Sequence, residues 1–213
     1  MLHREVRPAT TVHTVEGMTG PHAAPSHRDD DASNAHPSIR RLGTSVSPDE
    51  FKSLFRGHPG GVAVITAHGE NGPVALTASS VSSVSVDPPL LIFSASTISS
   101  ATPAIAAADT LVVHLLDADD IDLARLGATS GVDRFADETA WTRLATGEPV
   151  FHGVRAWARC AIVSRMDAGS STVIAAHALQ ISIDRHVEPG EPGNALVYHN
   201  RDWHRLGEHS RLG

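Results

Sequence analysis

The sequence predicts a mainly β protein, a β-barrel with peripheral helices, on three observations. Residues 156–163 and 172–183 are two long apolar runs of strand-forming side chains, separated by a short turn, as the wall of a barrel requires. Residues 77–85 form a third candidate strand, in which hydroxyl side chains are interrupted only by alanine and valine. The pair Pro88-Pro89 ends this strand because proline lacks an N–H, and the apolar run 90–93 follows.

The 213 residues, 41% of them hydrophobic, are enough to bury one core. Residues 1–44 contain no Phe, Trp or Tyr and show no periodicity, so we expect a disordered N-terminal extension. The five histidines of this segment are irregularly spaced, which favours a chance occurrence of histidine over a metal site. We therefore expect one folded domain at residues 45–207 and a short C-terminal tail at residues 208–213.

Charge and composition exclude several classes of partner. The formal net charge is −7 with no basic run, which argues against nucleic acid. No apolar run approaches the length of about 18 residues that a membrane span needs, and the first residues lack the apolar core of a secretory signal. The single cysteine, Cys160, rules out a disulfide framework within the chain, so we expect a cytoplasmic protein.

The domain should open with a helix after Ser47. Ser47 can cap it, Pro48 suits its first position, and Glu50 completes a capping box. Phe51, Leu54 and Phe55 follow at the spacing of a buried helix face. Gly57 should end the helix, and residues 62–66 should form a strand that returns through a loop at residues 69–72.

The second half of the domain supplies the remaining strands and one more helix. Residues 111–116 predict a buried strand, with His114 as a core histidine, and residues 117–120 should cap a helix over residues 121–126. Cys160 has apolar neighbours and no adjacent base, so we interpret it as structural. Residues 195–206 are interpreted as one closing strand, on which His199 and His204 would face opposite ways, which argues against a zinc site with His209.

The hydroxyl-rich segments leave two interpretations open. Residues 77–85 fit either a half-exposed strand with hydroxyls facing water or a strand that lies along a polar ligand. Ser99, Ser100 and Thr102 precede Pro103 at the start of a candidate helix, where they could form a phosphate seat or an ordinary N-cap. Arg134, within Asp133-Arg134-Phe135, could face a phosphate or the carbonyl edge of a ligand's ring, or could equally be half of a surface Asp–Arg pair.

One motif resembles a known family closely. The run LTASSVSSVSVDPPLLIFSAS is similar to the signature of the flavin reductase family, the FMN-binding split barrel. The matching positions are Thr77, Ser79, Ser80, Ser83, Val84, Ser85, Asp87, Pro88, Pro89, Leu90 and Phe93. Further similarities at Asp133-Arg134-Phe135 and Tyr198-His199 extend the resemblance over residues 47–206.

The resemblance implies a function and a set of site residues. It implies hydride transfer from NADH or NADPH to FMN, with FAD as an alternative flavin, in a homodimer that supplies a partner monooxygenase. The implied cofactor-binding residues are Thr77, Ala78, Ser79, Ser80, Ser94, Ala95, Ser96, Ser99, Ser100, Arg134 and Phe135. His199 would be the catalytic residue on the nicotinamide side, with Trp203 as an aromatic platform. Relatives commonly carry Arg or Lys near Thr97, and this chain has neither there.

Two other functions remain compatible with the sequence. The protein could store or carry FMN without turnover, which steady-state NADH oxidation with added FMN would reveal. It could also be a split-barrel flavin oxidase of the pyridoxamine-phosphate-oxidase type, although the Arg/Lys cluster that would bind a substrate phosphate is not found. The sequence has no Gly-rich dinucleotide fingerprint, so NAD(P)H should dock over the flavin in an open cleft.

Overall fold

A computed structural model describes residues 45–212 of the chain. The predicted disordered extension, residues 1–44, lies outside the described residues. In the described part no helix is long and apolar enough to cross a membrane.

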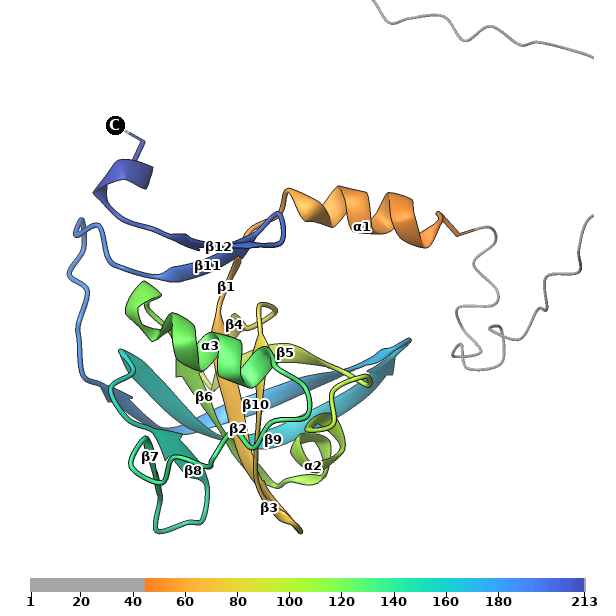
Figure 1. The fold of residues 1–213 in the computed structure, drawn as a ribbon, viewed down its shortest axis with the longest axis vertical. Coiled ribbons are helices and arrows are strands. Elements are labelled where there is room, and N and C mark those ends of the chain that lie inside the picture. The colour runs from red at the N-terminus through yellow and green to blue at the C-terminus, as the bar shows by residue number, and fades with distance from the viewer. Residues whose placement is uncertain (1–44, 213) are drawn as a thin grey trace, which may run out of the picture. The chain divides into compact units, whose positions relative to one another are not determined.

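The main sheet has seven antiparallel strands in the order β3-β2-β6-β9-β10-β5-β4 (Figure 1). Its strands are β2 (Ala63–Gly69), β3 (Gly72–Ala78), β4 (Ser82–Val86), β5 (Pro89–Ser96), β6 (Thr110–Leu115), β9 (Ala156–Ala168) and β10 (Ser171–Ile183). Strands β3 and β4 follow each other in the chain yet form the two opposite edges, and they do not pair with each other. The sheet is therefore a barrel left open between these edges, which confirms the predicted mainly β, split-barrel class.

Two predicted strands need correction. The hydroxyl-rich stretch 77–85 is not one strand: it leaves β3 at Ala78 and enters β4 at Ser82, and so joins the two edges of the split. The closing segment 195–206 is a hairpin of β11 (Leu196–His199) and β12 (Asp202–Arg205), which forms a three-stranded sheet with β1 (Gly60–Gly61). Asn200 and Arg201, with φ of 50° and 66°, make its two-residue turn, because left-handed residues match the twist of a tight hairpin.

The first helix forms as predicted but buries nothing. Helix α1 (Pro48–Arg56) has the full capping box between Ser47 and Glu50, and Gly57 is its C-cap. However, Phe51, Leu54 and Phe55 are 54%, 73% and 52% exposed, so the predicted burial of this face is wrong. The reason is tertiary: α1 extends away from the seven-stranded sheet (Figure 1), and within residues 45–212 no other element buries its apolar face.

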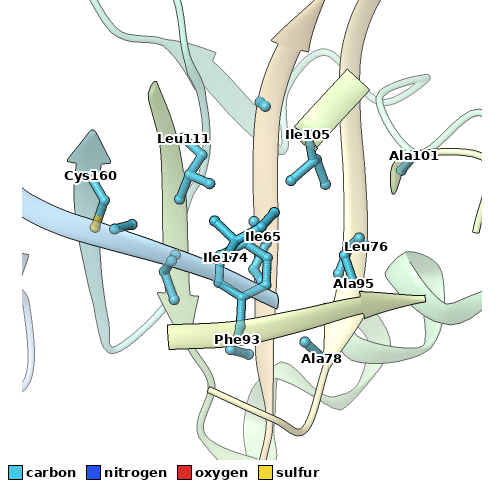
Figure 2. Close-up of a cluster of buried hydrophobic side chains, with 14 residues drawn as sticks. Ile65, Leu76, Ala78, Phe93, Ala95, Ala101, Ile105, Leu111, Cys160 and Ile174 are labelled. Carbon is cyan, nitrogen blue, oxygen red and sulfur yellow. The ribbon is translucent and has the colours of Figure 1, made fainter. Parts of the chain in front are cut away.

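One core fills the inside of the barrel. Phe93, Ile65, Ile174 and Leu111 converge there from β5, β2, β10 and β6, and Ile105 enters from α2 (Thr102–Ala107) (Figure 2). The predicted structural Cys160 belongs to this cluster, where burial raises the pKa of its thiol to about 11. Such a thiol stays protonated near neutral pH and is a poor nucleophile.

A second core lies on the other side of β2 and β6. It contains Val64, Leu116, Phe135 and Phe151, and it packs under α3 (Ile121–Ala128), the hairpin of β7 (Trp141–Arg143) and β8 (Pro149–Phe151), and β11. His114 is fully buried beside it, as predicted. Helix α3 therefore rests on the barrel at the edge where β3 ends.

Candidate functional site

A cavity of about 480 Å³ opens at the split of the barrel. Its lining, which we call the serine cleft, comprises Leu76, Thr77, Ala78, Ser79, Ser80, Ser94, Ser96, Ile98, Ser99, Ser100, Gly127, Ala128, Ser130, Arg134 and Ser171. Nine of the eleven residues expected to bind the cofactor are in this lining. Segments that are far apart in the sequence thus bring their hydroxyls to one cavity, in the volume range of ligand sites.

Helix α3 is held against β3 as one wall of the cleft. The Thr77 hydroxyl donates a hydrogen bond to the Ala124 carbonyl oxygen at 2.7 Å. A Cβ on Gly127 would overlap the Thr77 hydroxyl oxygen, so glycine is needed for this close approach. The Thr77 hydroxyl is therefore committed to positioning α3, which the sequence did not indicate.

Ser80 bridges the open edges of the barrel. Its hydroxyl accepts a hydrogen bond from the Ser94 N–H at 3.0 Å and lies 3.2 Å from the Ser94 carbonyl oxygen, to which it donates. The loop after β3 is thereby fastened to β5 across the split. Ser80 shapes the cleft, while its neighbour Ser79 makes no such side-chain bond within residues 45–212.

The turn from Ser96 to Thr102 closes the far side of the cleft. The Thr102 hydroxyl donates to the Ser96 carbonyl oxygen at 2.6 Å, and the Thr97 hydroxyl donates to the Ser170 carbonyl oxygen at 3.0 Å. Helix α2 has Ala101 as its N-cap and no side-chain cap, so the interpretation of these hydroxyls as an ordinary N-cap is wrong. The Ser100 hydroxyl bonds to no other residue in the described part of the chain, and it lies at the surface of the cleft.

Arg134 is the cation of the serine cleft. It donates from one terminal nitrogen to the Thr129 carbonyl oxygen at 2.6 Å, and no acidic side chain among the described residues pairs with it. Its Nε is buried and has no hydrogen-bond partner within residues 45–212. A buried guanidinium N–H without a partner costs free energy unless a ligand accepts from it. The cleft therefore fits a ligand that carries both acceptors along its length and an anionic group, as FMN does.

Two expected ligands of the flavin lie in the core instead. Ala95 is 1% exposed and faces the barrel interior, because Ser94 and Ser96 on either side take the outward positions of β5. Phe135 is 7% exposed, and its ring stacks on Phe151 with 5.1 Å between centroids. The expected apolar contact from Phe135 is thus corrected: its ring supports the core beneath the loop that carries Arg134.

The structure does not bring His199 or Trp203 to the serine cleft. Tyr198 and Trp203 pair on one face of the hairpin with ring centroids 4.9 Å apart, and His199 lies on the other face, opposite Asp202. The hairpin also brings His199 and His204 together, at 5.5 Å between ring centroids, so the expectation that they face opposite ways is wrong. In residues 45–212 no group of three or more metal-binding side chains forms.

The comparisons with known proteins identify the family of this chain. Residues 55–207 match the family described as the flavin reductase like domain. The chain is 36% identical over 187 residues to the NADH:FMN oxidoreductase of Rhodococcus qingshengii, which covers 87% of this chain and 95% of that protein. It is 32% identical over 126 residues to the reductase component of a flavin-dependent trigonelline monooxygenase of Acinetobacter baylyi, covering 59% and 40% of the two chains. The crystal structure of a flavin reductase domain protein from Arthrobacter sp. FB24 superposes with a TM-score of 0.68 at 30% identity, covering 78% of this chain and 97% of that chain.

The match includes the elements that build the site. It spans the open barrel, the loop from Ala78 to Ser82 that crosses the split, and the turn that carries Ser99 and Ser100. With a split barrel and a hydroxyl-lined cleft at its opening, this chain belongs to the flavin reductase family.

Proposed function

We propose that this protein transfers a hydride from NADH to FMN bound in the serine cleft. The observation that carries the proposal is the convergence of nine expected flavin ligands on one cavity, together with the unpartnered Nε of Arg134. A bound flavin supplies the redox chemistry, because its ring accepts the hydride and can pass the electrons on. The Rhodococcus relative, named as an NADH:FMN oxidoreductase, supports NADH and FMN as the pair.

The residues of this chain act by binding and orienting. The Ser99 and Ser100 turn offers hydroxyl and backbone donors for the phosphate, and Arg134 supplies the positive charge that the segment around Thr97 lacks. The hydrogen bonds between Ser80 and Ser94 hold the loop after β3 in place. The hydrogen bond from Thr77 keeps α3 in position as one wall of the cleft. Holding both reactants in one geometry contributes a large share of such a rate, so no acid–base pair is required in the cleft.

The reduced flavin would serve a separate oxygenase. The related reductase component of Acinetobacter baylyi belongs to a flavin-dependent monooxygenase, which supports such a partner for this chain. The cleft opens at the surface of the chain, with Ser79, Ser80 and Ser100 exposed and Ser99 half-buried, so a flavin held there could be released.

Turnover tests the proposal directly. The purified protein should oxidise NADH at 340 nm only when FMN is added or bound, and the flavin absorbance should bleach under anaerobic conditions. Binding of FMN with no reduction by NADH or NADPH would instead support the non-catalytic carrier. Absence of FMN binding would overturn the flavin site itself.

Replacing both Ser99 and Ser100 by alanine should weaken FMN more than tenfold while riboflavin changes little. The reason is that riboflavin lacks the phosphate, and each hydrogen bond to a charged group contributes about 1.5–3 kcal/mol. Flavin fluorescence quenching measures both dissociation constants. Ser130→Ala, elsewhere in the same lining, is the control. Equal weakening of FMN and riboflavin would place the phosphate at another part of the cleft.

We further propose that the chain forms a homodimer through the β9–β10 hairpin. Strand β9 pairs with β6 only from Ala156 to Ala161, and β10 pairs with β5 only from Ser171 to His177. The halves without a second neighbour carry exposed apolar side chains, namely Val163, Met166, Leu179, Ile181 and Ile183. Exposed apolar strand halves invite another chain, and a two-fold axis lets the same surface cover itself.

Light scattering should therefore give twice the mass of one chain at micromolar concentration. Ile181→Asp should shift the protein towards monomer, because a carboxylate would be buried at the interface. The control is Val132→Asp, an exposed valine in the loop after α3. A parent protein that is monomeric and still binds FMN tightly would contradict the proposal.

A further inference from the structure

A second cavity, of about 720 Å³, adjoins the serine cleft. It lies between α1, the turn before β1, the loop after β3 and the turn of the β11–β12 hairpin. We call it the arginine groove, and its lining is Phe51, Lys52, Phe55, Arg56, His58, Pro59, Gly60, Gly61, Ser79, Ser80, Val81, Ser82, Tyr198, Asn200 and Arg201. Ser79 and Ser80 belong to both linings, so the two cavities meet at these residues.

The groove gathers the arginines that the fold leaves without partners. Eleven arginines lie in residues 45–212, and nine of them donate side-chain hydrogen bonds or form ion pairs within this part of the chain. The two that do neither are Arg56 and Arg201, and both line the groove. The lining includes no Asp or Glu, and Lys52 adds a third cation, 3.4 Å from Asp49. An anionic ligand is the natural complement of such a surface.

Arg201 is held at the groove at a conformational cost. Its φ of 66° is left-handed, a conformation that favours glycine at the second position of a two-residue hairpin turn. Backbone strain at a residue whose side chain makes no hydrogen bond or ion pair within residues 45–212 points to function rather than to folding. The neighbouring Asn200 N–H donates to the Arg56 carbonyl oxygen at 3.0 Å, which ties the two arginine-bearing segments together.

The same groove offers aromatic surface. Phe51 and Phe55 lie 4.9 Å apart between ring centroids and are about half exposed, and Tyr198 belongs to the same lining. A flat, apolar heterocycle can pack on such rings. Gly60 lets β1 pass in contact with the Ser79 backbone, where a Cβ would overlap the Ser79 carbonyl oxygen. The floor between the two cavities is therefore made of backbone and small side chains.

We infer that the arginine groove binds the ADP half of a dinucleotide whose redox half lies in or over the serine cleft. Arg56 and Arg201 take the pyrophosphate, and the adenine packs against Phe51 and Phe55. The inference rests on the proposed function. It adds that the arginine groove is the feature by which the protein prefers a dinucleotide, NADH or FAD, over the corresponding mononucleotide. Both NADH and FAD carry an ADP half, so the groove serves either the hydride donor or the flavin.

The test compares each dinucleotide with its mononucleotide. The variants are Arg56→Gln and Arg201→Gly, and the second removes the cation together with the backbone strain of the turn. The charge-matched control is Arg211→Gln, because Arg211 is exposed and lies outside both linings. Steady-state kinetics at saturating FMN compares NADH with reduced nicotinamide mononucleotide, and fluorescence quenching compares FAD with FMN. Melting temperature is recorded for every variant, and Arg201→Gly should not lower it.

If the groove holds the hydride donor, the ratio of kcat/KM for NADH over reduced nicotinamide mononucleotide falls at least tenfold in the variant that combines Arg56→Gln with Arg201→Gly, mainly through KM. If the groove holds the flavin, the preference for FAD over FMN falls by a similar factor, and the ratio of kcat/KM for NADH over reduced nicotinamide mononucleotide stays unchanged. Equal losses for dinucleotide and mononucleotide, or no loss in either comparison, overturn the inference. A parent protein without NADH turnover contradicts the proposed function alone, since the comparison of FAD with FMN still tests the groove.

Discussion

Replacing Arg159 by alanine should lower the free energy of unfolding by about 3–5 kcal/mol, because it leaves a buried carboxylate without its cation. Arg159 on β9 donates from Nε to Glu148 at 2.8 Å, and the Glu148 side chain is only 2% exposed. Thr146 also donates its hydroxyl to this carboxylate. The pair joins the segment before β8 to the barrel wall, on the side where the second core supports the Arg134 loop.

The pH dependence of this loss of stability identifies the charge on Glu148 as its cause. Burial raises the pKa of Glu148, but hydrogen bonds from Thr110, Thr146 and Arg159 outweigh it, so the pKa is lowered overall. A lowered carboxyl pKa contributes stability above the unfolded-state value that is lost as the pH falls through the folded one. The deficit of Arg159→Ala should therefore shrink towards acid pH, where Glu148 takes up a proton.

Chemical denaturation at several pH values measures this deficit. Arg125→Ala removes an exposed ion pair with Asp122 on α3 and should change stability by no more than about 0.5 kcal/mol. A double variant with Glu148→Leu should recover part of the loss, because no buried charge then remains. A loss for Arg159→Ala as small as that for Arg125→Ala would show that the pair contributes little.

Lowering the pH from 7 to 4 should cost the parent protein about 3 kcal/mol of stability through His114 alone. The Phe151 N–H donates to His114 Nε2 at 3.1 Å, so Nε2 is the unprotonated nitrogen and Nδ1–H donates to the Val64 carbonyl oxygen at 3.0 Å. A proton on Nε2 would break the first bond and place a charge at a fully buried position. Burial accordingly lowers the pKa of His114 to about 4, although the bond to Val64 acts in the opposite sense.

The folded and unfolded pKa values of His114 set the direction in which stability changes with pH. The unfolded chain, with a histidine pKa of about 6.5, takes up the proton first as the pH falls. The contribution of His114 is therefore complete above about pH 6.5 and is lost between about pH 6.5 and 4. His114→Gln removes the titration, so its unfolding free energy should fall less steeply over this range than that of the parent. Equal slopes for the two proteins would contradict the assignment.

The effect of His114 should reach the serine cleft. His114 on β6, Val64 on β2 and Thr77 on β3 lie in register across three neighbouring strands. Thr77 holds α3, so losing the hydrogen bonds of His114 should also weaken the position of α3 as the wall of the cleft. FMN affinity measured between pH 5 and 7 should decline together with stability in the parent, and less so in His114→Gln.

Much of this protein was determined by the sequence alone. The capping box at Ser47, the paired strands β9 and β10, the buried His114 and the family resemblance all rest on local patterns, and local hydrogen bonds and alternation of side chains are enough to produce them. The family resemblance also pointed to nine residues of the serine cleft. These features depend on neighbours in the sequence or on a motif of fixed spacing.

The tertiary structure decided which of these side chains are free for a ligand. Helical spacing places Phe51 on an apolar face, and the family resemblance places Phe135 at the flavin. Only packing shows that Phe51 stays exposed while Phe135 stacks in the core. The run of hydroxyls does not reveal that Thr77 and Ser80 are already hydrogen-bonded, since their partners lie 47 and 14 residues away. The arginine groove forms because Asn200 and Arg201 turn back onto the end of α1, a contact between residues about 145 positions apart that no local pattern encodes.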